Sequence, residues 1–362
     1  LSSAASDVYK RQVLAALATL AACSKTEVTP VASNVNSEIT FNVAPRTKAL
    51  SQTQTDFDHN NVFVSYAYYL GHGKTWAANN SEAQMYIDGS TISYNGNLWK
   101  NETTSYYWPK DGGSLTFFAY SYNKKDMTVG DNSGFACVWA PGEDGQYQGG
   151  INGHFDVATN KNVDFLVADI AADKSENKNS YAHTGVPTLF RHKLSMVNVA
   201  ANLAEDYANK KFILNSVKFT NLCHYATYSQ IPEKMIPGGN MFLSDQVYAE
   251  NVGFEVKSGG LIAVPAEIKK GAGVEDGQYI YIPQEFNDDS YIVITYTVET
   301  VVGNKVVKEE CTKPVKVKDV FPKWEMGHRY TFNLTFSLNE IHWDPAVENW
   351  IDDEAGNITI DR

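Results

Sequence analysis

Residues 291–317 read YIVITYTVETVVGNKVVKEECTKPVKV, and this stretch decides the fold class. Apolar and polar residues alternate over 291–302 and again over 306–317, which is the period of a β-strand. Gly303-Asn304 lies between the two runs, and a pair of this kind suits the tight turn of a hairpin. The stretch therefore predicts two antiparallel strands joined by a short turn.

The same pattern extends over most of the chain. Aromatic residues, which favour strands, are abundant: 21 Tyr, 17 Phe and 7 Trp. Turn pairs such as Asp88-Gly89 and Asp276-Gly277 separate the apolar runs, and only 157–162 and 203–210 suggest short helical turns. Further strands are expected at 61–70, 83–89, 114–121, 163–170, 194–203, 212–222, 279–283 and 329–339. The sequence predicts an all-β protein built from β-sandwiches.

The domain organisation follows from length and from one polar interruption. A chain of 362 residues can form two domains. The stretch AADKSENKNSYAHTG (171–185) breaks the strand pattern, so we expect two tandem sandwiches, at about 38–178 and 179–362, the second with an extension at about 342–362. EDGQY occurs at 143–147 and at 275–279, which predicts two similar hairpins.

The N-terminal region has the features of an export signal. Residues 13–22, VLAALATLAA, are apolar but too few to span a bilayer, and Lys10-Arg11 precede them. Leu20-Ala21-Ala22-Cys23 follows the pattern of a bacterial lipobox, so Cys23 is the expected lipidation site; the alternative is an ordinary signal peptide with a chance cysteine. Residues 1–12 are interpreted as a non-native scar and 24–37 as a polar tether.

Residues 38–50, EITFNVAPRTKAL, combine a strand with a protease site. Ile39, Phe41 and Val43 alternate with polar residues, as in a strand with one buried face. An extended basic segment follows, in which a trypsin-like protease would cut between Arg46 and Thr47, with Lys48 as second choice. Such a cut would make the first strand a separate piece.

Motifs for catalysis or metal binding are not convincing. GHGKT (71–75) lacks the leading glycine of a phosphate loop, because position 68 is Tyr, and it leads to no expected helix. Nucleophile-elbow, zinc-protease and zinc-finger spacings are missing, and Asp288-Asp289 lacks calcium-loop spacing. We expect no enzyme, metal or cofactor. A net charge of −12 also argues against nucleic acid and anionic lipid as partners.

Three smaller features have two interpretations each. His192 is expected to be a hydrogen-bonded packing residue rather than a ligand. Tyr106-Tyr107-Trp108 is expected to be strand and core material rather than a sugar-binding platform. The other cysteines are expected to be buried free thiols, although a disulfide remains open: Cys137, Cys223 and Cys311.

Four motifs carry a family resemblance: VDFLVAD (163–169), VPTLFRHKLSMVNV (186–199), ILNSVKFTNL (213–222) and WEMGHRYTFNLTFSLNEIHWDPAVENW (324–350). Together with the lipobox they resemble the fimbrillins of Bacteroidales, the Mfa1-like and FimA-like subunits of type V pili. The resemblance implies transthyretin-like, Greek-key sandwiches and export as a lipoprotein to the outer membrane. It also implies an Arg- or Lys-specific protease that removes the first strand, matched here by Arg46–Thr47, and a groove that accepts a strand from the next subunit.

The resemblance further implies a C-terminal donor strand, with other pilin subunits as partners and the cell surface as location. The candidate donor residues are Trp350, Ile351, Ile358 and Ile360, although Asp352-Asp353-Glu354 would sit badly in an apolar groove. A stalk subunit is favoured over a tip subunit. The alternative is an uncut, lipid-anchored adhesin, glycan-binding module or anchor subunit. The sequence names no host or bacterial surface receptor.

Overall fold

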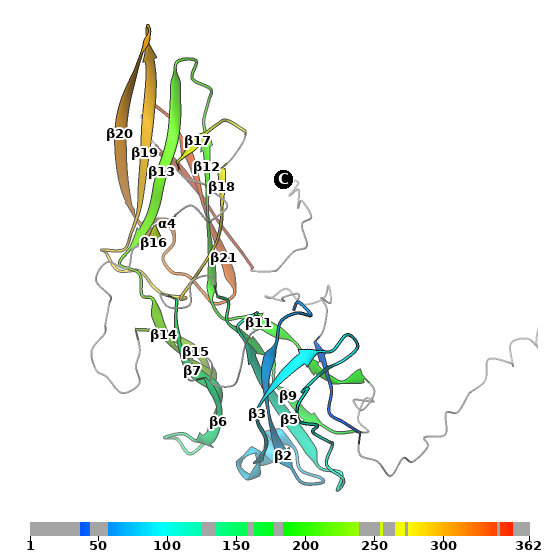
Figure 1. Cartoon of the computed structure of the whole chain (residues 1–362). Coiled ribbons are helices and arrows are strands. Elements are labelled where there is room, and N and C mark those ends of the chain that lie inside the picture. The colour runs from blue at the N-terminus through cyan, green and yellow to red at the C-terminus, as the bar shows by residue number, and fades with distance from the viewer. Residues whose placement is uncertain are drawn as a thin grey trace, which may run out of the picture. The chain divides into compact units, whose positions relative to one another are not determined.

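The computed structural model describes residues 37–43, 57–124, 135–157, 163–176, 184–238, 254–255, 265–271, 274–338 and 341–349. Within these ranges the protein is nearly all β, with 22 strands in four sheets and three one-turn helices. The all-β prediction is therefore confirmed (Figure 1).

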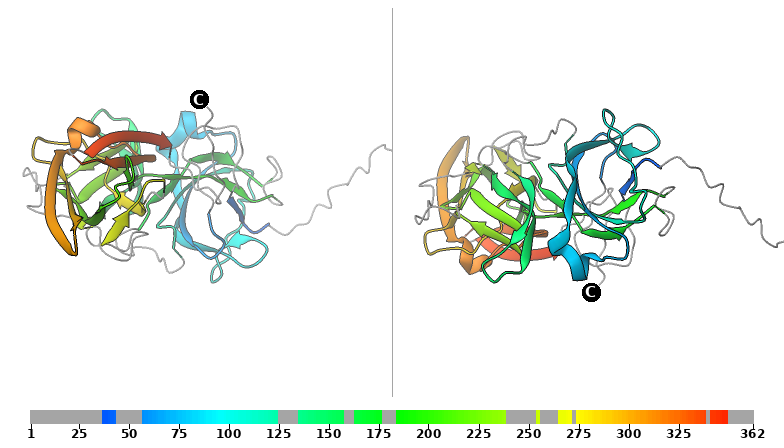
Figure 2. Two further views of the ribbon diagram at one scale, coloured as in Figure 1. Left: turned by 90° about the horizontal axis from the view of Figure 1, so that it is seen from above. Right: turned by 90° about the horizontal axis from the view of Figure 1, so that it is seen from below.

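The nine-stranded sheet has the order β10-β1-β4-β3-β2-β5-β8-β11, with β9 paired to β5. β10 and β11 stand at the two ends of this order, yet only Leu189 separates them along the chain. The sheet therefore curls until its ends meet (Figure 2). Its strands are β1 (Phe41–Val43), β2 (Phe63–Leu70), β3 (Gln84–Tyr94), β4 (Trp99–Lys100), β5 (Ser114–Ser121), β8 (Leu166–Ala168), β9 (Ala171–Lys174), β10 (Val186–Thr188) and β11 (Phe190–His192).

Both faces of this sheet are covered. β2 and β5 are buried along almost their whole length, which explains their nearly continuous apolar sequences. On one face, Phe63 and Phe117 belong to the core that the curled sheet encloses. On the other face, Tyr66 and Phe118 pack against the sheet β15-β14-β7-β6. The strands of that second sheet are β6 (Ala136–Pro141), β7 (Tyr147–Asp156), β14 (Tyr225–Ile231) and β15 (Glu233–Pro237).

The remaining strands form a sandwich. One layer, β18-β12-β21-β22, faces the other, β16-β13-β19-β20 with β17 on β13, and Phe219, Ile292 and Phe332 fill the space between them. The predicted hairpin of 291–317 is confirmed as β19 and β20, with Gly303 at φ +59° in its turn (Figure 1). The strands are β12 (Ser195–Leu203), β13 (Lys210–Thr220), β16 (Phe254–Glu255), β17 (Ala266–Ile268), β18 (Val274–Tyr281), β19 (Tyr291–Val302), β20 (Lys305–Lys316), β21 (His328–Phe336) and β22 (Ile341–Asn349).

Two predicted turns are wrong. Asp88-Gly89 lies inside β3, opposite a register shift between Ser65 and Ala67 of β2, and Gly89 adopts φ +68°. Asp276-Gly277 lies inside β18, opposite a register shift in β12, so the second EDGQY forms no hairpin. A β-bulge and a turn both need residues that tolerate unusual backbone angles, which is why Asp-Gly suits either. The first EDGQY does form the turn between β6 and β7.

The sheets do not divide at the expected boundary between 178 and 179. β10 and β11 follow that point but pair with β1 and β8, and β14 pairs with β7. The polar stretch that suggested the boundary even contains β9, which pairs with β5. Long-range strand pairing carries no local sequence signal, which is why the polar stretch resembles a domain boundary.

The helices whose bounds fall within the described residues are single turns: α2 (Trp76–Asn79), the 3₁₀ turn η1 (Asn80–Glu82) and α4 (Val317–Val320). α2 directly follows GHGKT, where no helix was expected, because four residues are too short to show helical periodicity. No helix in the described part of the chain is long and apolar enough to cross a membrane.

The three described cysteines are free thiols. The predicted burial is confirmed for Cys137 and Cys223 and is wrong for Cys311, which is half-buried. Burial raises the pKa of the Cys137 thiol, so its reactive thiolate is disfavoured near neutral pH. We expect iodoacetamide to modify Cys137 in the folded protein at least tenfold more slowly than in urea. Mass spectrometry of labelled peptides measures this; equal rates in both conditions would contradict the burial.

Candidate functional site

The candidate functional site is the slot that β1 occupies in the curled sheet. β1 runs parallel to β10, with Phe41 opposite Val186, and antiparallel to β4, with Phe41 opposite Trp99. The Val186 amide donates a 2.7 Å hydrogen bond to the carbonyl of Thr40. β1 is therefore an internal strand with a neighbour on each side.

The residues just before β1 are bound by a segment distant in sequence. The Ile39 amide donates to the Tyr106 carbonyl at 2.7 Å, and the Trp108 amide donates to the Ser37 carbonyl at 3.1 Å. The run Tyr106-Tyr107-Trp108, expected to be core and strand material, thus pairs with the first strand, and Trp108 is buried. The sequence did not predict this pairing, because the two segments are distant in the chain and neither contains a local pattern that points to the other.

The side chains of the first strand complete an aromatic core. Ile39 and Phe41 are 3% and 5% exposed, Val43 is half-buried and Asn42 is exposed. Thr40 is also buried, at 7%, so the predicted alternation holds over Phe41–Val43 and not at Thr40. The Phe41 ring lies 5.5 Å from that of Phe63 and 5.7 Å from that of Phe117, both nearly perpendicular. Edge-to-face pairs of this kind are favourable in addition to the burial of their area.

Polar contacts at the start of the strand fix its register. The Glu38 carboxylate lies 3.2 Å from the Lys100 ammonium and accepts a hydrogen bond from Ser105 Oγ at 2.8 Å. Ser37 donates through its backbone amide and its hydroxyl to Glu176 Oε1. These contacts are partly solvated, so they position the strand more than they stabilise it.

Because Gly185 has no side chain, its backbone can lie in close contact with the backbone of β1. It adopts φ +78°, and a Cβ built on it would lie 2.7 Å from the carbonyl carbon of Phe41 and 3.0 Å from the Asn42 nitrogen. Any side chain here would collide with backbone rather than with a flexible side chain. The sequence signal was weak, since a Gly before Val186-Pro187-Thr188 resembles an ordinary loop end.

β1 covers apolar surface and fills the gap between two other strands of the sheet. Without β1, the apolar surfaces of Phe63 and Phe117 and the paired edges of β4 and β10 would be exposed. An exposed strand edge is a template for another chain. β1 itself is paired on both of its edges, with β10 on one side and β4 on the other.

Most of the other predicted site residues lie outside the described residues: Cys23, Arg46, Thr47, Trp350, Ile351, Ile358 and Ile360. The expected C-terminal extension from 342 is corrected in its first part, because β22 pairs with β21 as an ordinary strand through Asn349. His192 is a packing residue as predicted: it is buried, with Nδ1 2.7 Å from Asp164 Oδ2. Among the described residues, no group of three or more His, Cys, Asp or Glu could hold a metal ion.

Comparison with known proteins gives the family. The model of the Fimbrillin-like family matches residues 47–350. The chain belongs to the fimbrillin-like family. Membership supports a role as a subunit of a cell-surface fimbria, with other pilin subunits as partners. The match to this fimbrillin-like chain begins at Thr47, the residue that follows Arg46.

The fimbrillin-like fold is also found among solved structures. A fimbrial protein from Bacteroides vulgatus superposes with a TM-score of 0.66 at 18% identity, covering 87% of this chain and all of its own. Two putative cell adhesion proteins, from Bacteroides ovatus and Bacteroides uniformis, overlap more loosely. Their TM-scores are 0.47 and 0.46, both at 14% identity, and they cover 89% and 84% of this chain and all of their own. Among curated proteins, none matches the chain.

Proposed function

We propose that this chain is a fimbrial stalk subunit assembled by donor-strand exchange. It is exported as a lipoprotein through Cys23, cut after Arg46, and polymerised when a neighbour's strand replaces β1. The observation that carries this proposal is the position of β1 as an internal strand of a sheet whose other strands curl into a nearly closed ring.

Cleavage is the step that makes the strand replaceable. Before the cut, a short connection ties β1 to the body, so a strand that leaves rebinds at high effective concentration. After the cut, only noncovalent contacts hold it. Burial of Ile39 and Phe41 contributes about 1.5–3 kcal/mol each. The released strand then diffuses away together with the lipid on Cys23, which frees the subunit from the membrane.

The C-terminal residues supply a donor that matches the slot. Ile358-Thr359-Ile360 repeats the order of Ile39-Thr40-Phe41: apolar, threonine, large apolar. In this register Ile358 replaces Ile39, Ile360 replaces Phe41, and Asp361 falls at the exposed place of Asn42. The acidic run 352–354 then precedes the apolar part of the slot, which removes the predicted misfit.

The two longest edge strands of the C-terminal sandwich disfavour strand addition. β20 and β22 are two of the edge strands of the C-terminal sandwich, and each carries a proline, Pro314 and Pro345. Proline has no amide hydrogen to donate at an open edge. β20 also exposes charged residues along its length, which further blocks pairing. An exchange confined to the β1 slot links subunits head to tail and builds an open filament.

Polymerisation of the cut precursor tests this proposal. After treatment with an arginine-specific protease, we expect the wild type to form ladders on a gel and filaments by electron microscopy. Arg46→Ala should reduce polymer at least tenfold, whereas the matched variant Lys48→Ala should behave as wild type. Ile360→Asp should be cut normally but fail to donate. If Arg46→Ala polymerises as well as wild type, the cleavage role is wrong.

A second candidate is an uncut, lipid-anchored adhesin or anchor subunit. It is favoured by the hydrogen bonds and strand pairing that residues 37–43 make with segments on both sides, which suit a protein that keeps its first strand. Mass spectrometry of the protein from native cell surfaces separates the two. An N-terminus at Thr47 supports the polymerising subunit, and an acylated Cys23 supports the anchored one.

A further inference from the structure

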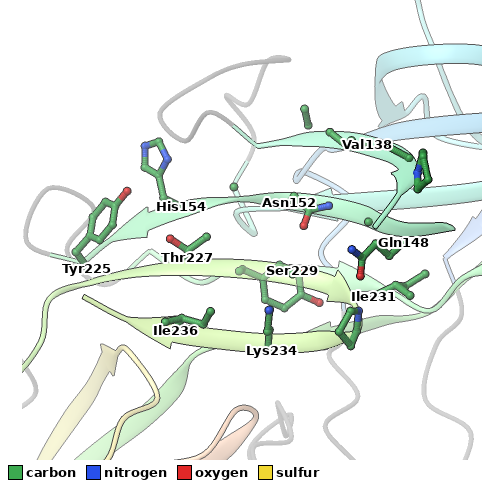
Figure 3. Close-up of a pocket in the computed structure, with 17 residues that line it drawn as sticks. Val138, Gln148, Asn152, His154, Tyr225, Thr227, Ser229, Ile231, Lys234 and Ile236 are labelled. Carbon is green, nitrogen blue, oxygen red and sulfur yellow. The ribbon is translucent and has the colours of Figure 1, made fainter. Parts of the chain in front are cut away.

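The outer face of the sheet β15-β14-β7-β6 carries a hollow of about 510 Å³ (Figure 3). Ile151 and Phe155 of β7 and Tyr228 of β14 point into the core on the other face. Strand alternation therefore places Asn152 and His154 of β7 on the outer face, together with Thr227 and Ser229 of β14. A hollow of this size is in the range of small-ligand sites.

A row of three different polar groups crosses the hollow. The register places Asn152 of β7 opposite Ser229 of β14, and Ser229 opposite Lys234 of β15. The Asn152 amide donates to the Gly150 carbonyl at 2.8 Å, which leaves its oxygen to accept. Within the part of the chain that the structure describes, the Ser229 hydroxyl and the Lys234 ammonium make no hydrogen bond or ion pair. The row offers a ligand an acceptor, a hydroxyl and a positive charge.

Rings and apolar side chains border this row. The His154 and Tyr225 rings stack at one end of the hollow, 5.4 Å apart with an interplanar angle of 29° (Figure 3). Val138, which is 48% exposed, and Ile236 lie on opposite sides of the row. A ligand here would meet flat apolar surface beside polar donors, a combination suited to the two-sided character of a sugar ring.

The charge of the hollow differs from that of the whole chain. The chain has a net charge of −12, yet none of the residues that line the hollow carries a carboxylate. Lys234 is the one lining residue with a permanent positive charge. A ligand with a negative group is therefore attracted locally, whereas one with a positive group has no partner.

We propose that this hollow binds an acidic saccharide, a sugar ring that bears a carboxylate. The apolar face of the ring lies against Tyr225 and His154, its hydroxyls bond Asn152 and Ser229, and its carboxylate pairs with Lys234. A peptide strand is a poorer occupant, since the backbone groups of β7 and β14 are already paired with their neighbours. Saccharide binding would give the fimbrial subunit an adhesive surface apart from the β1 slot.

Titration calorimetry and saturation-transfer NMR on the uncut full-length chain test this inference. The probes are 3′-sialyllactose and a hyaluronan tetrasaccharide, both with carboxylates, and lactose, which has none. We expect both acidic probes to bind at least tenfold more tightly than lactose. Lys234→Gln and Tyr225→Ala should each weaken acidic binding at least tenfold without changing the unfolding midpoint.

Lys305→Gln is the matched control, because it removes the same charge from the exposed start of β20 and should leave binding unchanged. Binding of neither acidic probe, equal binding of lactose, or full binding by Lys234→Gln would overturn the inference. So would a loss of polymerisation in Lys234→Gln with saccharide binding intact, since the hollow would then be an interface between subunits. Because the uncut chain is used, failure of strand exchange does not affect the result.

Discussion

Replacing Gly185 by alanine is expected to destabilise the uncut chain by about 1–3 kcal/mol more than replacing Gly73 by alanine. Both glycines adopt φ +78°, so both variants suffer the same left-handed backbone strain, about 1–2 kcal/mol. The difference lies in space: a Cβ on Gly185 meets the backbone of Phe41 at 2.7 Å, and a Cβ on Gly73 meets nothing within 4 Å. Urea unfolding followed by tryptophan fluorescence measures both losses.

The same pair of variants also tests strand exchange. Any strand in the slot passes the same glycine, so cut Gly185→Ala should polymerise at least tenfold less than cut Gly73→Ala. Hydrogen exchange at the amides of 38–43 should rise in uncut Gly185→Ala alone. Equal losses of stability in the two variants would mean that β1 does not run against Gly185.

Replacing Phe41 by alanine is expected to cost the uncut precursor about 3–5 kcal/mol, because it empties a buried site between Phe63 and Phe117. A loss of about 3 kcal/mol corresponds to roughly a hundredfold in an equilibrium constant. The weaker strand should therefore leave faster after cleavage. We expect polymerisation of cut Phe41→Ala, followed by light scattering, to be at least tenfold faster than that of wild type.

Asn42→Ala is the control, because Asn42 is the exposed neighbour in the same strand and its replacement should change stability by less than about 0.5 kcal/mol. After cleavage and strand release, the Phe41→Ala and wild-type bodies have identical sequences. Their finished polymers should therefore unfold at the same temperature. An unchanged polymerisation rate in Phe41→Ala would show that departure of β1 does not limit assembly.

The sequence alone predicted those parts of the fold that depend on local patterns. β19 and β20 were predicted from the alternation in 291–302 and 306–317 and from the Gly303-Asn304 turn between them. β5 was predicted with its exact bounds, 114–121. Alternation of Ile39, Phe41 and Val43 gave the first strand. These predictions succeeded because burial of one face and turn geometry both act over a few neighbouring residues.

Where local signals were ambiguous, the predictions failed. Asp88-Gly89 and Asp276-Gly277 have turn chemistry but serve as irregularities inside β3 and β18. The polar stretch 171–185 resembles a linker, yet strands on both sides of it belong to one sheet. Each failure has the same source, since the role of such residues depends on which distant strand lies beside them.

The sequence by itself determined that this protein is all-β, that its first strand has one apolar face, and that a basic segment suited to a protease follows. Only the tertiary structure decided where that strand goes: between β10 and β4, bound by Tyr106 and Trp108, and passing directly over Gly185. The physical reason is that alternation depends on the side chains of neighbouring residues, so it can be recognised in the sequence. Strand pairing instead joins backbone amides and carbonyls that are distant in the chain, and nearly every residue type has these groups.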